Sequence, residues 1–340
     1  MAISRVGIIA NPASGKDIRR LVAFASVCDN MEKVNIVRRA ILGMASVGVD
    51  EVLIMPDTFN IGYRVVDTLR ETAGFDIACS LSSKVSLLDM PVTGTDVDST
   101  NAAHMMNEAE VGCVIVVGGD GTNRAVAKGC GETPILPIST GTNNVIPYMI
   151  ESTVAGLVAG MVAKKIVDTE KSTIRTKKLH ITRNSEPLDI ALVDVVVTDD
   201  LFVGARALWD ISKVRQVVAT RGEPSNIGMS SILGMFLPIR VDDPFGISLK
   251  IGKGRLKVKA PIAPGLIEEV EVGAFRKLEI GDEVAVGFKP SILALDGERE
   301  IEVYNEDDVR IRLERDGPML VDVEEVLREA VGKRFFCREG

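Results

Sequence analysis

Three glycines and an aspartate follow the most apolar short run of the chain. The run is CVIVV at 113–117, and Gly118-Gly119-Asp120-Gly121-Thr122-Asn123 comes directly after it. An uninterrupted apolar run is typical of a buried parallel strand, and open α/β sheets bind ligands at the carboxyl ends of such strands. The glycines would permit positive φ and bring backbone NH groups close to a polyphosphate, with Asp120 beside it. The alternative is a tight turn, packed through glycine, into a helix over 123–128.

Two further turns have residue types that suit phosphate or nucleotide contacts. Asn11-Pro12-Ala13-Ser14-Gly15-Lys16 follows the apolar run 6–10, so free NH groups and a helix dipole would face an anion there. It lacks the Walker A pattern, and the alternative is a strand-to-helix turn capped by Ser14. Thr140-Gly141-Thr142-Asn143-Asn144 follows the run 135–139. Its hydroxyls and amides could bind ribose, a base edge or phosphate, or could cap the next helix.

A third kind of segment, Asp296-Gly297-Glu298, lies between β-prone runs at 292–295 and 300–303. Asp-Gly is the strongest short signal for a β-hairpin, so the residues by themselves favour a turn. Because a turn can also lie at a domain cleft, this interpretation leaves a functional glutamate possible.

The first half of the chain must position the first three of these loops. It alternates short apolar runs with helical patterns, which predicts a parallel sheet covered by helices on both faces. In a helix from about residue 31, the apolar residues recur at helical spacing and Lys33 falls outside that face. The expected strands are 6–10, 51–55, 75–79, 85–88, 113–117 and 135–139.

From about residue 171 the pattern changes to many short β-prone runs. The longest of them, 190–197, is predicted to form one strand. Alternation of apolar and polar residues predicts mainly antiparallel sheets, interrupted by helical pieces at 202–214 and 226–237. We therefore expect an α/β domain over 1–168, a second, β-rich domain over 169–321, and a C-terminal helix and tail over 322–340.

Composition excludes several kinds of function. The chain has 340 residues, 46% hydrophobic and 26% charged, which is the balance of a globular protein with a sizeable core. A net charge of -8 with 4% aromatic residues argues against nucleic-acid binding. With only two histidines, a histidine-based zinc site or a Ser/His/Asp catalytic triad is not expected. Five separated cysteines predict reduced thiols in the cytoplasm. We expect no secretory signal and no stable membrane association.

Taken together, the segments resemble the superfamily of NAD kinases, diacylglycerol kinases and sphingosine kinases. The resemblance extends over nearly the whole chain, and NPASGKDIRRL, GGDGTNRAVA and STGTNN are most similar to the ATP-NAD kinase branch. It rests on four motifs in the family's order: Asn11-Pro12-x-Ser14-Gly15-Lys16, Gly118-Gly119-Asp120-Gly121-Thr122, Gly141-Thr142-x-Asn144 and Asp296-Gly297-Glu298.

The resemblance implies a Rossmann-like, NAD kinase type α/β domain, a second β-rich domain, and a nucleotide between them. ATP would be the phosphoryl donor, with Mg²⁺ or another divalent metal that Asp120 could contact, and NAD would be the acceptor. The general base would be Glu298, as in the lipid kinases, or Asp120, as in the NAD kinases. The resemblance also implies a homo-oligomer acting on small molecules. The expected nucleotide and phosphate contacts are Asn11, Ser14, Gly15, Lys16, Gly118, Gly119, Gly121, Thr122, Asn123, Thr140, Gly141, Thr142, Asn143 and Asn144.

The acceptor half departs from the family pattern. NAD kinases carry an Asn-Glu pair where the nearest match is Val193-Asp194, and their Gly-Ser-Thr-Ala-Tyr segment corresponds to 228–232, which lacks the tyrosine. Asp194, Ser230 and Asp296 are the acceptor-binding candidates. The leading hypothesis is phosphoryl transfer from ATP to NAD. The alternatives are a kinase for another alcohol, such as a small diol, a polyol or a lipid, and a nucleotide-binding regulator without turnover.

Overall fold

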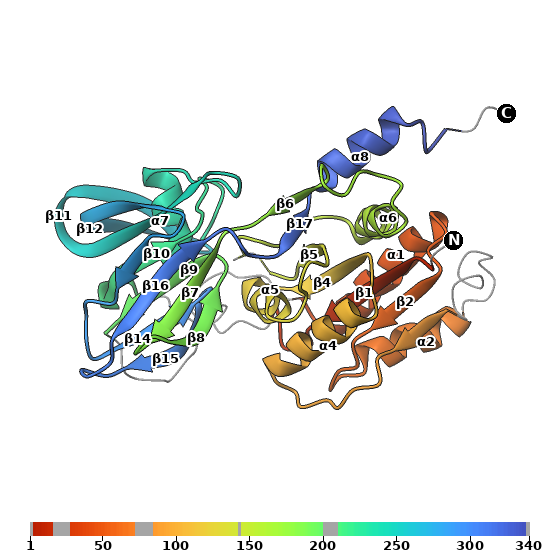
Figure 1. Ribbon diagram of the computed structural model, residues 1–340, viewed down its shortest axis with the longest axis horizontal. Coiled ribbons are helices and arrows are strands. Elements are labelled where there is room, and N and C mark those ends of the chain that lie inside the picture. Colours follow the sequence, from red (N-terminus) through yellow and green to blue (C-terminus); the bar gives the residue numbers. More distant parts are fainter. Residues whose placement is uncertain (1–2, 16–27, 72–83, 142–143, 200–209, 338–340) are drawn as a thin grey trace.

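The chain folds into an α/β part and a β-rich part that lie end to end (Figure 1). The structure is a computed structural model, and it describes residues 3–15, 28–71, 84–141, 144–199 and 210–337. The α/β part is built on one mostly parallel sheet, and the β-rich part on two antiparallel sheets. The predicted fold class is therefore confirmed.

A seven-stranded sheet in the order β3-β2-β1-β4-β5-β17-β6 forms the centre of the α/β part. β1 to β5 pair in parallel, β17 continues parallel to β5, and β6 closes the edge antiparallel to β17. Every residue of β4 is buried, because Ile115 packs into the core on one face of the sheet and Val116 into the core on the other. The strands are β1 (Arg5–Ala10), β2 (Glu51–Ile54), β3 (Val85–Leu87), β4 (Cys113–Gly118), β5 (Ile135–Ser139), β6 (Thr173–Arg175) and β17 (Met319–Val321).

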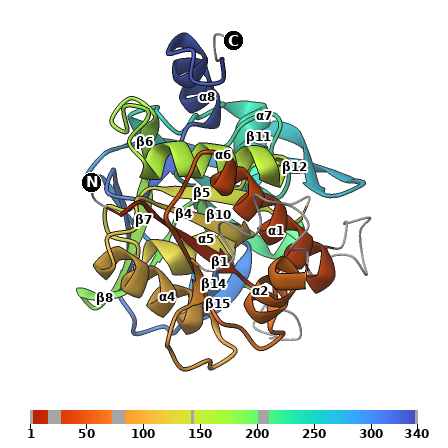
Figure 2. The same cartoon turned by 90° about the vertical axis from the view of Figure 1, so that its right-hand side faces the viewer.

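Helices cover both faces of this sheet, as its uninterrupted apolar strands require. One face carries α1 (Asn30–Ser46), α2 (Ile61–Glu71), α6 (Ser152–Ala163) and α8 (Val323–Gly332), and the other α4 (Asp96–Glu108) and α5 (Asp120–Ala127) (Figures 1 and 2). The C-terminal helix α8 thus returns to the α/β part, where Val326 and Ala330 are fully buried. Within the described part of the chain, no helix combines the length and apolarity that crossing a bilayer needs.

The β-rich part is a sandwich of a six-stranded sheet, β12-β11-β10-β9-β14-β15, and a four-stranded sheet, β13-β16-β7-β8. Leu179, Val197 and Leu293 belong to the apolar core that both sheets share, and α7 (Met229–Phe236) covers the other face of the larger sheet. The strands are β7 (Lys178–Arg183), β8 (Glu186–Ala191), β9 (Asp194–Thr198), β10 (Val214–Ala219), β11 (Phe245–Ala263), β12 (Leu266–Glu279), β13 (Glu283–Ala285), β14 (Ser291–Leu295), β15 (Glu298–Val303) and β16 (Val309–Glu314).

Two predicted elements differ from the structure. The strand expected over 190–197 is two strands, separated at Leu192 and Val193, because an aspartate side chain from a distant turn bonds both of their NH groups. The helix expected over 202–214 is wrong at its end: a short 3-10 helix at Ile211–Lys213 precedes β10, where Val214 begins a strand paired with β9. Residues 202–209, and the strand expected at 75–79, lie outside the described residues.

The chain passes between the two parts twice, at 176–177 and at 315–318, and the passages lie side by side. Thr176 donates its NH to the Pro318 carbonyl at 3.2 Å, and Gly317 returns one to the Thr176 carbonyl at 3.1 Å. β6 and β17 pair in the seven-stranded sheet of the α/β part, although their residues fall inside the second domain expected over 169–321. The domain boundaries at 168 and 321 stay a prediction.

Lys177, in the first passage, is 2% exposed and donates from Nζ to the carbonyls of Phe245 (2.7 Å) and Arg240 (3.1 Å). Burial, with the positive charge of Arg315, lowers the pKa of this lysine to about 8. Between pH 8 and 10 the unfolded chain therefore binds more protons than the folded one, and stability rises with pH.

We expect the free energy of unfolding of the wild type to increase relative to that of Lys177→Met across this interval. After allowance for solvent screening, the increase is on the order of 1–2 kcal/mol. Urea unfolding at pH 8, 9 and 10 measures it. Parallel curves for the two proteins would contradict the lowered pKa.

Candidate active site between the two parts

The glycine loop, residues 118–121, follows β4, in which every residue is buried, and leads into α5, which begins at Asp120, three residues earlier than predicted. Positive φ is absent at Gly118, Gly119 and Gly121, so the expectation that they adopt it is wrong. Close approach explains them instead. A Cβ on Gly119 would lie 2.8 Å from Asn144 Oδ1, and one on Gly121 would lie 3.2 Å from Glu298 Oε1. The loop therefore needs glycine because groups from two other segments lie against its backbone.

Asp120 links the glycine loop to the segment that follows the Thr140 turn. The side chain is almost fully buried, and its carboxylate accepts the NH groups of Val145 (2.9 and 3.2 Å) and Ile146 (2.8 Å). Amide donors stabilise the ionised carboxylate. Asp120 therefore has a structural role: it fixes the backbone at Val145 and Ile146 beside the carboxyl end of β4.

Hydrogen bonds also bring the first turn into this group of loops. Asn11 donates from Nδ2 to Thr122 Oγ1 at 2.9 Å, and the hydroxyls of Thr140 and Ser14 are 3.1 Å apart. Ala13 donates its NH to Asn11 Oδ1, and Ser14 to the Asn11 carbonyl. These two NH groups are therefore used inside the turn, and the predicted phosphate contacts of Ser14 and Gly15 stay a prediction. Lys16, Thr142 and Asn143 lie outside the described residues.

Lys33 lies under the first turn and not on the polar face of its helix, so the position predicted for it is wrong. It is 0% exposed, and its Nζ donates to the carbonyls of Asn11 (2.9 Å), Pro12 (3.2 Å) and Ser14 (2.7 Å). A buried ammonium needs such partners, and the turn supplies them. Helical spacing carries no sign of this contact, because the carbonyls belong to a turn elsewhere in the chain.

Two asparagine side chains donate hydrogen bonds within the loops that follow β4 and β5. Asn144 donates from Nδ2 to Ser139 Oγ at 2.8 Å, and Asn123, which is fully buried, donates from Nδ2 to the Gly119 carbonyl at 2.9 Å. Both side chains therefore maintain the shape of the turns at the ends of β4 and β5.

The segment Asp296-Gly297-Glu298 is both a hairpin turn and part of the cleft. Asp296 and Gly297 have φ of 50° and 85°, and Leu295 pairs with Glu298 across the turn. Positive φ at both central residues is the signature of a type I′ hairpin, which confirms the predicted turn. The same turn places the Glu298 carboxylate against Gly121 of the glycine loop.

The Asp296 side chain does not extend into solvent. Its carboxylate accepts the NH groups of Leu192, Val193 and Asp194 at 2.8–3.2 Å. Burial raises the pKa of Asp296 to about 6, although the Arg124 guanidinium and the amide donors oppose the rise. This carboxyl therefore holds the connection between β8 and β9 in place.

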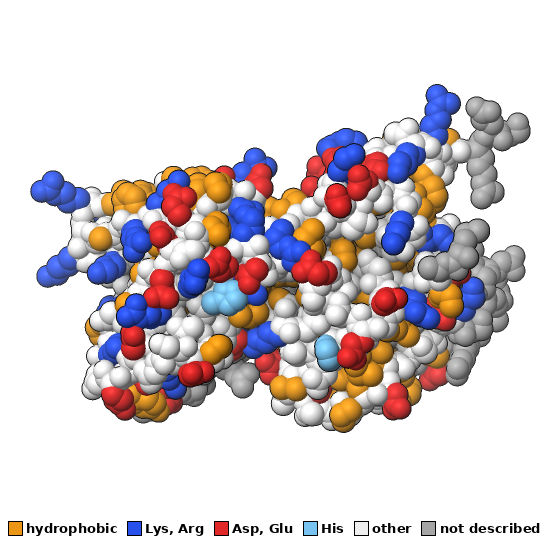
Figure 3. Space-filling model, viewed as in Figure 1, with side chains coloured by type: hydrophobic (Ala, Val, Ile, Leu, Met, Phe, Trp, Pro, Cys, Tyr) orange, Lys and Arg blue, Asp and Glu red, His pale blue; other side chains and the backbone are white. Residues whose placement is uncertain are grey.

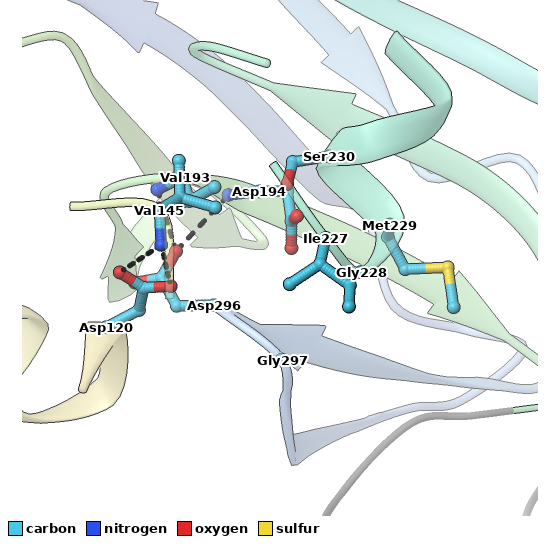
Figure 4. A pocket seen from close by; sticks show the side chains of 10 residues that line it. All are labelled: Asp120, Val145, Val193, Asp194, Ile227, Gly228, Met229, Ser230, Asp296 and Gly297. Atoms are coloured by element: carbon cyan, nitrogen blue, oxygen red, sulfur yellow. Dashed lines mark hydrogen bonds between the residues drawn. The ribbon is translucent and has the colours of Figure 1, made fainter. Parts of the chain in front are cut away.

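A pocket lies between the two parts of the chain (Figure 4), and of the predicted site residues Asp120, Asp194, Ser230 and Asp296 line it. Its cavity measures about 30 Å³. Asp120 comes from the α/β part, whereas Asp194, Ser230 and Asp296, the acceptor candidates, come from the β-rich part. Val193, Gly228, Met229 and Gly297 also line the pocket and belong to motifs recognised in the sequence, whereas Val145 and Ile227 have no chemically distinctive side chain that would have pointed to them.

Comparison with known proteins agrees with this division of the chain. The model of the ATP-NAD kinase N-terminal domain matches residues 6–166, and that of the acetoin catabolism protein X C-terminal domain matches residues 177–316. Acetoin catabolism protein X of Cupriavidus necator is 39% identical, over 98% of this chain and 94% of its own.

Solved structures described as a diacylglycerol kinase and a putative diacylglycerol kinase of Bacillus anthracis have 14% and 13% identity. Their TM-scores are 0.41 and 0.44, over 94% of this chain and 97% of each of theirs.

The matching N-terminal domain and the motif order place the chain in the NAD kinase and diacylglycerol kinase superfamily, as predicted from the sequence. Within that superfamily, the chain belongs to the family of acetoin catabolism protein X.

Proposed function

We propose that this chain is a kinase that transfers the γ-phosphoryl group of ATP to a hydroxyl group of NAD. The observation that carries the proposal is the meeting of the Glu298 carboxylate with the glycine loop at Gly121. A carboxylate from one part thus lies against a loop at the carboxyl end of a central strand in the other, the position at which α/β sheets bind ligands. The ATP-NAD kinase match over 6–166 supports the nucleotide half.

In this reaction the acceptor hydroxyl gives its proton to a carboxylate while its oxygen forms a bond to the γ-phosphorus. The bond between that phosphorus and the bridging oxygen breaks, and ADP leaves. Phosphoryl transfer depends mostly on positioning and charge neutralisation. Glu298 is the better candidate for the base, because its carboxylate reaches the glycine loop from the β-rich part, whereas the Asp120 carboxylate holds the NH groups of Val145 and Ile146.

A divalent metal fits the charges of the pocket. Asp120, Asp194 and Asp296 line it together, so a polyphosphate would meet several negative charges unless a cation accompanied it. The described residues contain no group of three metal-ligating side chains. However, Mg²⁺ commonly uses one or two protein carboxylates together with phosphate oxygens and water. Asp120 would be the protein ligand, and the metal would supply neutralisation of the phosphate charge.

A second candidate, a kinase for another alcohol, is favoured by the acceptor half of the site. Residues 177–316 match the acetoin catabolism protein X domain, and Val193-Asp194 stands where NAD kinases have Asn-Glu. Ser230 is retained beside Asp194 in the pocket, without the tyrosine of the NAD kinase segment. A small hydroxylated molecule, such as acetoin or a diol, is the alternative acceptor.

One experiment decides between these functions. The purified chain is incubated with γ-labelled ATP and Mg²⁺, together with NAD, NADH, acetoin, small diols, inositol or diacylglycerol vesicles, and the labelled product is identified. We expect labelled NADP. Label in a diol or in acetoin instead would support the second candidate. Stabilisation of the fold by ATP without transfer to any acceptor would indicate a nucleotide-binding regulator.

A further inference from the structure

A buried arginine joins the helix of the glycine loop to the β-rich part. Arg124 lies one turn after Asp120 in α5 and is 2% exposed. Its Nη1 donates to Asp189 Oδ2 at 3.2 Å, and its Nε lies 3.7 Å from Asp296 Oδ2. Asp189 belongs to β8 and Asp296 to the hairpin turn before β15, so one guanidinium contacts two separate segments of the other part.

A second cation also contacts Asp189. Lys128, which directly follows α5, has its Nζ 2.8 Å from Asp189 Oδ1, so each of the two carboxylate oxygens has a cationic partner. On the face seen in Figure 3, acidic and basic side chains gather along the junction of the two parts. Arg124 differs from such partly exposed pairs, because its burial removes the solvent screening that weakens surface ion pairs.

Asp296 connects Arg124 with the backbone of the site. Its carboxylate holds the NH groups of Leu192, Val193 and Asp194, so it sets where the Asp194 backbone lies at the pocket. In the chain, Asp296 is two residues before Glu298, which touches the glycine loop. A displacement of the Asp296 turn would therefore move groups from two strands at once.

We propose that Arg124 is a positioning residue that holds the Asp296 turn against α5 and thereby places Glu298 opposite the nucleotide loops. This inference rests on the proposed kinase function. The planar guanidinium can donate to Asp189 from Nη1 while its Nε stays within ion-pair distance of Asp296, whereas a lysine ammonium offers one compact charge. Arg124 does not line the pocket, so its effect on turnover is indirect.

The test compares Arg124→Gln and Arg124→Lys with the wild type in steady-state kinetics and in amide hydrogen exchange of the full chain. In Arg124→Gln we expect kcat to fall about 100-fold, the size of a misplacement of about 1 Å, with the KM for ATP unchanged. Amides of peptides containing 192–194 and 293–298 should exchange faster, while those of α4 should not change. Arg124→Lys should recover part of kcat.

Arg5→Gln is the control, since Arg5 pairs with Glu51 at the amino ends of β1 and β2, away from the carboxyl ends where the glycine loop lies. It should keep the wild-type kcat. Loss of ATP binding in proportion to kcat in Arg124→Gln, or unchanged exchange at 192–194, would overturn the inference.

Two further outcomes are also decisive. If Arg124→Gln does not fold, Arg124→Lys carries the test, and wild-type exchange and kcat in that variant would count against the inference. If the wild type transfers phosphate to no acceptor, the kinase proposal fails, and exchange at 192–194 alone decides whether Arg124 positions the turn.

Discussion

Replacing Asp120 by asparagine should reduce turnover by roughly 10³-fold, because phosphoryl transfer depends on a correctly charged and positioned site. Asparagine has nearly the same shape but neither the negative charge nor a second acceptor oxygen. Its amide NH₂ would face one of the NH donors of Val145 and Ile146, which the carboxylate satisfies. We therefore also expect a loss of stability of about 1–3 kcal/mol. Turnover with saturating ATP and urea unfolding measure the two effects separately.

Asp50→Asn provides the control for the structural part of this change. Asp50 accepts the NH and the hydroxyl of Ser4 at 2.9 and 2.6 Å, next to the start of β2 and away from the carboxyl ends of the strands. The same substitution there should cost stability while turnover stays at the wild-type level. Near-wild-type turnover in Asp120→Asn would show that the centre of the site is assigned wrongly.

Replacing Glu298 by glutamine should lower kcat by roughly 10²–10⁴-fold if this residue takes the proton of the acceptor hydroxyl. Glutamine retains the size and most of the polarity of the side chain against Gly121, but it cannot accept that proton. Because the nucleotide loops remain intact, ATP should stabilise the variant against heat as much as it stabilises the wild type. Initial rates and thermal unfolding with and without ATP give both quantities.

Glu302→Gln is the matched control on the same strand. Glu302 is exposed and hydrogen-bonded to the Tyr304 hydroxyl, away from the glycine loop, so its substitution should leave kcat unchanged. Comparison with Asp120→Asn then identifies the base. A loss confined to Asp120→Asn would assign the proton transfer to Asp120 and contradict the role proposed for Glu298.

Much of the fold could be predicted because several strands and turns have a clear local pattern of residue types. CVIVV at 113–117 is apolar at every position, and such a run is expected for a strand that is buried on both faces of a sheet. The Asp-Gly pair at 296–297 predicts its hairpin because few other residues tolerate positive φ at both positions. The pattern did not divide 190–197 into two strands, because the break depends on the distant carboxylate of Asp296.

The sequence by itself determined the candidate segments: the glycine loops and an aspartate are recognisable from residue type and spacing, whereas the hairpin glutamate became a candidate through the family resemblance. Only the tertiary structure decided how they meet. It showed that the glycines serve close approach rather than positive φ, that Lys33 is buried under the first turn, and that Arg124 contacts Asp189 and Asp296. The physical reason is that local patterns reflect the backbone and the face of one element. Buried charges, in contrast, are satisfied by partners that chain folding brings from far along the sequence.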